Sequence, residues 1–333
     1  MSFALAQRGT TLTYARIIAT GSALPERVVT NADLEKIVDT SDEWIRTRTG
    51  IEQRHIAADG ETTGDLAFRA AEQALERAGV KASELDLLII GTTTPDIVFP
   101  STACLVQHRL GANGCAAFDV NAACSGFVYA LGVANAMVRA GQAKKALVIG
   151  AETLTRMVDW GERETCVLFG DGAGAVVLEA SEEPGIMATC LHADGGYKEL
   201  LYNPVGVSVG FNDEPNHGVR IRMKGREVFK IAVKTFDALV GETLQAAGMQ
   251  ESDVDWLIPH QANLRIIQAT AKRLKLPMER VIVTVHKHAN TSSGSVPLAL
   301  DAAISSGQVK RGQNLLLEAF GGGFTWASAL LKY

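Results

Sequence analysis

The chain has 333 residues, of which 47% are apolar and 21% are charged, and its formal net charge is −5. This composition is typical of a globular protein with a large core, and the acidic balance argues against nucleic acid as a general partner. Five cysteines with no Cys-x-x-Cys pair favour a reducing compartment and argue against disulfides or a structural metal. No apolar run could span a bilayer, and residues 1–13, expected to form a loose tail, lack a signal-peptide core. We therefore expect a cytoplasmic protein without membrane contact.

The elements expected next along the chain begin with a strand and two short capped helices. Residues 15–20 predict the strand. Thr30 can cap a helix that runs to residue 38, and Ser41 can cap a second helix over residues 44–48. An amphipathic helix over residues 65–78 then leads into a buried strand near residues 86–91.

Cys124 stands where an expected strand meets an expected helix. It lies within the small-residue run Asn-Ala-Ala-Cys-Ser-Gly, and the apolar residues 127–131 follow it as the start of a buried helix. The unpaired N–H groups and positive dipole end of such a helix stabilise a thiolate, so the position suits a nucleophile. On its own, however, a cysteine among alanines is more often a small buried apolar residue than a catalyst.

The pattern around Cys124 recurs 169 residues later in the chain. In each half an amphipathic helix leads into an apolar strand, then into a helix opened by small polar residues, and then into another strand. Four separated segments agree at this one offset: 78–79 with 247–248, 86–91 with 255–260, 121–131 with 290–300, and 147–148 with 316–317. The agreement indicates two duplicated α/β halves, with the second amphipathic helix over residues 227–247.

Two glycine-rich runs need separate interpretations. Residues 165–169 and 173–178 resemble strands that flank Gly-Asp-Gly, which predicts a hairpin with an Asp-Gly turn. The run has no following helix and no Lys-Ser/Thr, so a phosphate-binding loop is disfavoured. The run at 321–324 predicts a tight turn, or a close backbone approach to a ligand with an exposed N–H as oxyanion donor.

The duplication brings two more polar residues into the hypothesis. His260 closes an apolar strand of the second half, and Asn290 opens the helix that corresponds to the one after Cys124. Functional residues of α/β sheets gather at strand carboxyl ends and helix N-termini, so packing the halves about a pseudo-twofold axis would bring all three residues into one cavity. A neutral histidine and an asparagine amide can both donate hydrogen bonds to an oxyanion. Alone, His260 suits a structural role equally well, and Asn290 suits a helix cap better.

The motifs around Cys124, His260 and Asn290 resemble those of a known family, the β-ketoacyl-[acyl-carrier-protein] synthase III enzymes, which initiate bacterial fatty-acid synthesis. The Cys-His-Asn set separates this branch from thiolases (Cys-His-Cys) and elongating synthases (Cys-His-His). The resemblance runs from about residue 14 to the C-terminus. The matching motifs are Thr-Ser-Asp-Glu-Trp-Ile at 40–45, Arg-Thr-Gly-Ile at 48–51, Asp-Val-Asn-Ala-Ala-Cys-Ser-Gly at 119–126, Phe-Gly-Asp-Gly-Ala-Gly at 169–174, His-Gln-Ala-Asn at 260–263, Asn-Thr-Ser at 290–292 and Gly-Gly-Gly-Phe-Thr-Trp at 321–326.

The resemblance implies a thiolase-like, five-layered αβαβα fold with halves at residues 14–185 and 186–333. It also implies decarboxylative condensation of a short acyl-CoA, most simply acetyl-CoA, with malonyl-[acyl-carrier-protein]. Cys124 would carry the acyl group, with its own N–H and that of Gly322 as the oxyanion hole, and His260 and Asn290 would stabilise the enolate. No metal or resident cofactor is expected, because the CoA thioester is a substrate.

The resemblance further assigns binding residues and a homodimer. Phe99 resembles a residue that crosses the dimer interface and ends the acyl pocket, where its bulk would favour short primers. Residues implied to bind CoA are Trp44, Arg48, Thr49, Arg163, Phe229 and Asn263. Separately, the local basic excess in the second half could steer an acidic carrier protein, although a solvated helix face explains it almost as well. The carrier-protein candidates are Lys230, Arg265, Lys272 and Arg273.

Three positions depart from the family pattern, and two other functions stay open. Ala289 stands where glycine is expected before Asn290, and Arg226 and Glu164 stand near the CoA site where smaller or neutral residues are common. One alternative is a Cys-His-Asn enzyme of specialised metabolism that makes a quinolone or polyketide or transfers acyl groups. The other is a non-catalytic acyl-CoA-binding relative.

Overall fold

The computed structural model describes residues 13–210 and 220–333 and contains two main sheets. The expected tail therefore lies almost wholly outside the described residues. The first sheet has the order β1 (Tyr14–Ala23), β7 (Asp171–Ser181), β6 (Lys145–Thr153), β4 (Leu87–Gly91) and β5 (Ala116–Val120). The second has the order β8 (Ile186–Ala193), β13 (Thr325–Lys332), β12 (Asn314–Gly321) and β11 (Trp256–Pro259). In the described residues, no helix is long and apolar enough to cross a membrane.

The two sheets repeat one topology. In the first, β4 runs parallel to β5 and β6, and β7 runs antiparallel to β6 and β1. In the second, β11 runs parallel to β12, and β13 runs antiparallel to β12 and β8. Residue 281 forms a parallel bridge to β11, in the place that β5 takes beside β4. The strands of the first sheet lie within residues 14–181, and those of the second lie within residues 186–332.

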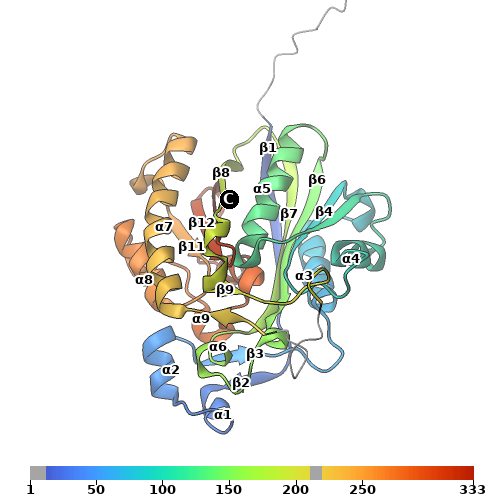
Figure 1. Ribbon diagram of the computed structural model, residues 1–333. Helices are drawn as coiled ribbons and strands as arrows, with labels where there is room; N and C mark the ends of the chain where they lie inside the picture. The colour runs from blue at the N-terminus through green and yellow to red at the C-terminus, as the bar shows by residue number, and fades with distance from the viewer. Residues whose placement is uncertain (1–12, 211–219) are drawn as a thin grey trace, which may run out of the picture.

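Helices complete five layers, in the expected αβαβα order (Figure 1). Two helices, α5 (Gly126–Arg139) and α10 (Ser295–Ser305), lie between the sheets and contact both of them. On the outer face of the first sheet lie α3 (Thr63–Ala78) and α4 (Thr102–Leu110). On the outer side of the second sheet lie α7 (Gly225–Ala247), which packs on β13 and β8, and α8 (Leu264–Arg273), which packs on α7.

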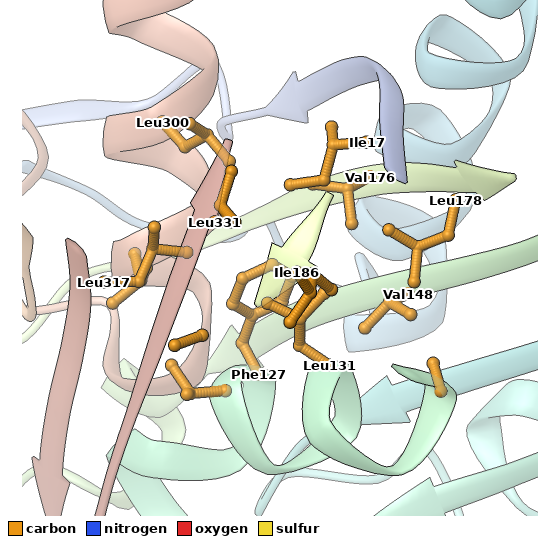
Figure 2. Packing of buried hydrophobic residues seen from close by; sticks show 14 of the residues in the cluster. Ile17, Phe127, Leu131, Val148, Val176, Leu178, Ile186, Leu300, Leu317 and Leu331 are labelled. Atoms are coloured by element: carbon orange, nitrogen blue, oxygen red, sulfur yellow. The ribbon is translucent and has the colours of Figure 1, made fainter. Parts of the chain in front are cut away.

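The core between the sheets is made of fully buried aliphatic and aromatic side chains (Figure 2). Phe127 and Leu131 of α5 meet Val148 and Val176 of the first sheet and Leu317 of the second. The central helices are mostly apolar because most of their residues are buried. Truncating Phe127 to alanine would cost about 3–5 kcal/mol by analogy with other core deletions.

The short helical turns confirm the sequence repeat in three dimensions. The 3₁₀ turns η1 (Ala82–Glu84) and η5 (Glu251–Asp253) are 169 residues apart, and so are η2 (Ala123–Ser125) and η7 (Ser292–Gly294). Ala123 and Ser292, which open the second pair, have left-handed φ angles of 47° and 49°. Each half therefore turns sharply from strand to helix at the same place.

Shorter elements gather at one end of the molecule, at the bottom of Figure 1. They include β2 (Val28–Thr30), α1 (Asn31–Leu34), α2 (Asp42–Thr49), β3 (Gln53–His55), α6 (Arg163–Cys166) and α9 (Val285–His288). Thr30 caps α1 as predicted, but this helix ends at Leu34 and not at residue 38. Ser41 caps α2, which is longer than predicted at both ends. The remaining elements are η3 (Leu154–Met157), η4 (Gly195–Leu200), β9 (Leu201–Tyr202), β10 (Arg222–Met223) and η6 (Met278–Arg280).

The predicted hairpin around Gly170-Asp-Gly is wrong. Residues 163–166 form α6, and Asp171 and Gly172 lie inside β7. Asp171 is fully buried, and its carboxylate accepts hydrogen bonds from the Ala57 N–H and from the N–H and hydroxyl of Thr155. Asp171 thus links the segments that carry Ala57 and Thr155 by buried hydrogen bonds. Local sequence preferences cannot distinguish this role of Asp-Gly from a turn.

Candidate active site

A cavity of about 1020 Å³ opens between the outer helices of the second half and the end formed by α2 and α6. It brings Cys124, His260 and Asn290 together as predicted. Their exposed fractions are 8%, 4% and 6%, so they form its buried end. Charged side chains surround the opening: Arg48, Arg163, Glu164, Lys224, Arg226, Glu227, Lys230 and Arg265.

Cys124 lies in η2, immediately before α5. Burial raises the pKa of its thiol to about 12, the Ser292 hydroxyl lowers this pKa by hydrogen bonding, and the charge of Glu152 raises it. The sequence predicted that the start of the helix would stabilise a thiolate. In the structure burial raises the pKa of the thiol, so Cys124 must lose a proton before it attacks.

His260 follows β11, and a hydrogen bond between its Nδ1 and the Ser295 hydroxyl fixes the orientation of its ring. Its Nδ1 lies 2.5 Å from the Ser295 hydroxyl, which also accepts a hydrogen bond from the Gln261 N–H at 3.3 Å. We therefore infer that the Ser295 hydroxyl donates its hydrogen bond to Nδ1 and that the ring hydrogen is on Nε2. Burial lowers the pKa of His260 to about 3, so the imidazole is neutral at physiological pH.

Asn290 is held by its backbone and by one side-chain bond. Its N–H donates to the Leu168 carbonyl, and its own carbonyl accepts from the Gly170 N–H. Its Oδ1 accepts from the Ser292 N–H at 2.9 Å, which leaves the Nδ2 amide to donate toward the cavity that Asn290 lines. The buried end therefore combines one sulfur nucleophile with two neutral N–H donors, a set able to stabilise an oxyanion.

The opening of the cavity contains the residues expected to bind CoA. The guanidinium groups of Arg48 and Arg163 lie 4.4 Å and 4.6 Å from the ring centre of Trp44. Phe229 also lines the cavity, and the Arg265 guanidinium lies 5.6 Å from its ring centre. A stacked aromatic ring among cations suits a planar, negatively charged ligand.

Two other expected CoA residues line the cavity but have their polar groups occupied. The Thr49 hydroxyl donates to the Ile45 carbonyl and accepts from the Ile51 N–H. Asn263 caps α8 through the Arg265 N–H, and its amide donates to the Arg48 carbonyl at 3.0 Å. These contacts fix the cavity wall, and α2 is thereby tied to α8.

Four expected residues do not line the cavity. Gly322 lies in the β12–β13 turn, where a Cβ added to its neighbour Gly321 would come within 2.5 Å of the Cys124 nitrogen. Phe99 is 83% exposed on the loop after β4. Lys272 and Arg273 end α8, and Arg273 pairs with Asp237. The roles assigned to these residues stay predictions.

The three departures from the family pattern have clear positions. Ala289 has φ 57° and ψ −159°, a conformation that favours glycine, and it is fully buried. The Asn290 backbone is nonetheless held on both sides by Leu168 and Gly170. Glu164 and Arg226 are exposed at the opening of the cavity.

Sequence reasoning missed the residues that support the site: Ser292, Ser295 and Glu152. Glu152 could have been found, because a charged residue near the carboxyl end of an otherwise apolar strand is the same signal that singled out His260. The serines carry no such signal. Their roles follow only from the neighbours that the fold provides.

Comparison with known proteins identifies the family. The model of the 3-oxoacyl-[acyl-carrier-protein] synthase III family matches residues 118–195, and its C-terminal model matches residues 244–333. A β-ketoacyl-[acyl-carrier-protein] synthase III from Xanthomonas campestris pv. campestris is 69% identical over 320 residues, which cover 96% of this chain and 98% of that protein. The chain belongs to the 3-oxoacyl-[acyl-carrier-protein] synthase III family. It is accordingly an enzyme, an acyltransferase with a thiolase-like fold.

Solved structures agree with this assignment. The synthase III from Aquifex aeolicus superposes with a TM-score of 0.90 at 52% identity, covering 96% of this chain and all of that one. The priming β-ketosynthase from the R1128 polyketide pathway superposes with a TM-score of 0.92 at 37% identity, covering 98% of each chain. Both likenesses extend over the whole two-half fold.

Proposed function

We propose that the protein condenses a short acyl-CoA, most simply acetyl-CoA, with malonyl-[acyl-carrier-protein]. The products are a 3-oxoacyl-[acyl-carrier-protein], CO2 and CoA, and the reaction initiates fatty-acid synthesis. The observation that carries the proposal is the convergence of Cys124, His260 and Asn290 at the buried end of one cavity. The family assignment supports the same reaction.

In the first half-reaction the Cys124 sulfur attacks the thioester carbonyl of the acyl-CoA. A bond forms from that sulfur to the acyl carbon, and the CoA sulfur leaves with the electrons of the broken bond. The N–H groups of Cys124 and Gly322 are the proposed oxyanion hole. The close approach of the 321–323 turn to the Cys124 backbone supports this pairing.

In the second half-reaction malonyl-[acyl-carrier-protein] loses CO2, and the electrons of the broken bond form a thioester enolate. The Nε2–H of His260 and the Nδ2–H of Asn290 donate to the enolate oxygen. The enolate carbon then attacks the acyl group, and Cys124 leaves as a thiolate. A neutral imidazole suits this step, because it already carries the donor hydrogen. The proposed route uses no metal or resident cofactor.

Charge and stacking at the cavity opening support the proposed substrates. Arg48 and Arg163 beside Trp44 suit the nucleotide part of CoA, and Phe229 suits its pantetheine chain. Lys230 and Arg265 at the opening suit an acidic carrier protein. Lys272 and Arg273 stand further along α8 and would extend that surface.

We also propose a homodimer that acts in the cytoplasm. Ile97, Val98 and Phe99 are exposed apolar residues on one loop, and a second copy of the chain could cover them and receive Phe99 at its primer pocket. The cysteines of the described residues are free, which suits a reducing compartment. Light scattering on the purified protein tests the dimer, and a monomer at micromolar concentration would contradict it.

The alternatives are less well supported. A role in specialised metabolism has one observation in its favour, the 37% identity to a polyketide priming synthase. The identity to synthase III of Xanthomonas campestris is much higher, at 69%. A non-catalytic acyl-CoA-binding role leaves the His260 and Asn290 donors without a use.

Acylation of Cys124 gives the most direct test of the proposed function. Incubation with acetyl-CoA should add the mass of one acetyl group to the intact protein, and Cys124→Ala should remove this adduct. With malonyl-[acyl-carrier-protein] present, the malonyl group on the carrier protein should be converted to a 3-oxobutanoyl group with release of CO2. Full condensing activity in Cys124→Ala would refute the mechanism, and a product other than the 3-oxoacyl carrier protein would favour the specialised alternative.

A further inference from the structure

Glu152 is a buried carboxyl group near the nucleophile, and the proposed condensation does not use it. It lies near the end of β6 and is fully buried. The Ser292 hydroxyl donates to one of its oxygens at 3.2 Å. The turn η7, which carries Ser292, packs against η2, which carries Cys124, and the Ser292 hydroxyl lowers the pKa of the Cys124 thiol, so Ser292 stands between the thiol and the carboxyl group.

The other contacts of Glu152 come from neutral groups. The loop after β4 supplies the hydroxyls of Thr92, Thr93 and Thr94, the last at 2.6 Å, and the Thr93 N–H. On β7, Gly172 lies beside it without a side chain. No lysine or arginine of the described residues forms an ion pair with it. A wholly buried carboxylate with only hydroxyl and N–H donors is able to gain a proton.

Two titratable groups lie near Glu152, one on η2 and one on β7; Glu179, also on β7, lies opposite Lys145 at the other end of β6. Cys124 on η2 is linked to it through Ser292. Asp171 on β7 immediately precedes Gly172, the residue opposite Glu152. Its carboxylate, however, already accepts hydrogen bonds from Thr155 and from the Ala57 N–H. Cys124 is therefore the group with which Glu152 can exchange a proton.

We propose that Glu152 accepts the Cys124 proton through the Ser292 hydroxyl when the nucleophile attacks. The inference rests on the role of Cys124 in the proposed function and adds the destination of its proton. Glu152 acts through Ser292 and does not touch the substrate. Because two negative charges so close together in a dry site repel strongly, the thiolate and the neutral acid form together.

The proton balance over the two half-reactions is complete. In the first, the thiol hydrogen moves to the Ser292 oxygen while the Ser292 hydrogen moves to Glu152, and the departing CoA thiolate takes a proton from water. In the second, Cys124 leaves as a thiolate and recovers the proton from Glu152 by the reverse path. During decarboxylation Glu152 is neutral, so it does not repel the enolate that forms nearby.

The acidity of Glu152 fits this role. Burial raises its pKa to about 7, although its hydrogen bonds from threonine and serine act in the opposite direction. Below about pH 7 the group already carries a proton and cannot accept another. The acylation rate should therefore fall as the pH drops through about 7, and it should level off above that value.

The test compares pH profiles of the wild type and Glu152→Gln, with Glu318→Gln as a matched control. Gln keeps the shape of Glu152 and one of its two accepting oxygens, but its amide cannot accept a proton. Glu318 is another fully buried glutamate, on β12. Two rates are measured from about pH 6 to about pH 9: acylation of Cys124 by acetyl-CoA, and its alkylation by iodoacetamide. At about pH 8, Glu152→Gln should acylate about 100-fold more slowly, and both rates should keep rising about tenfold per pH unit without a plateau.

A wild-type plateau in both the Glu152→Gln and Glu318→Gln profiles would overturn the proposal. Should Glu152→Gln not fold, Ser292→Ala interrupts the same path, and an unchanged profile in that variant would overturn it equally. The iodoacetamide rate needs no substrate. A wild-type protein that alkylates with a plateau but is never acylated would contradict the proposed function while leaving the role of Glu152 intact.

Discussion

At the scale of single residues, burial sets the protonation of the active site. Desolvation keeps Cys124 a thiol and His260 neutral, and it raises the pKa of Glu152 into the physiological range. Two serine hydroxyls act on these groups. Ser295 fixes the orientation of the His260 ring, and Ser292 lowers the pKa of the Cys124 thiol. The chemistry therefore depends on the exclusion of water as much as on the three reacting side chains.

Burial of Glu318 should make the free energy of unfolding depend on pH. Both of its carboxyl oxygens lack partners among the described residues, and burial raises its pKa from 4.5 to about 8. Between these two values the folded protein holds a proton that the unfolded chain has lost. The contribution of Glu318 to the free energy of unfolding should thus decrease as the pH rises through this window, by up to about 1.4 kcal/mol per unit.

The matching measurement is urea unfolding of the wild type and Glu318→Gln at about pH 5 and about pH 8. The variant should lose less stability between the two values than the wild type does. Equal losses in both proteins would show that Glu318 does not titrate in this range.

At the scale of elements, the active site exists because helix and strand backbones approach one another very closely. A Cβ on Gly150 of β6 would come within 2.2 Å of the Ser293 carbonyl oxygen, and one on Gly91 of β4 would come within 2.4 Å of Gly126. These glycines allow η2 and η7 to lie against the first sheet. The strand-to-helix turns that hold Cys124 and Asn290 are positioned by these contacts.

Gly150→Ala should therefore destabilise the protein by about 3 kcal/mol or more, since the contacting atoms belong to the backbone and cannot rotate away. Gly241→Ala is the control, because Gly241 is exposed in α7 with no atom near its Cβ position. That substitution should add about 0.5–1 kcal/mol. Denaturant midpoints measure both, and a Gly150→Ala protein as stable as the wild type would contradict this packing.

Much at this scale was predictable from the sequence, and the exceptions have one cause. The 169-residue repeat predicted the two similar α/β halves and the meeting of Cys124, His260 and Asn290. Long-range burial defeated the local rules elsewhere: Asp171 resembles a turn residue but ties Ala57 to Thr155. Ser292 and Ser295 gain their importance only from residues far away in sequence, which no local pattern encodes.

At the scale of the whole molecule, each half supplies one part of the chemistry. The first half contributes the nucleophile, and the second contributes both N–H donors. The molecule is acidic overall, yet the opening of the cavity is lined by six cationic side chains and two acidic ones. This local reversal of charge favours anionic substrates at the opening of the cavity that contains Cys124.

The central claim is that these halves perform separable steps within one cavity. The decisive measurement follows both steps in His260→Ala and Asn290→Ala, using intact mass for acetylation of Cys124 and release of CO2 from malonyl-[acyl-carrier-protein]. Both variants should acetylate within a few-fold of the wild type and should decarboxylate about 100- to 1,000-fold more slowly, because each lacks one enolate donor. Loss of acetylation with decarboxylation intact would contradict the account.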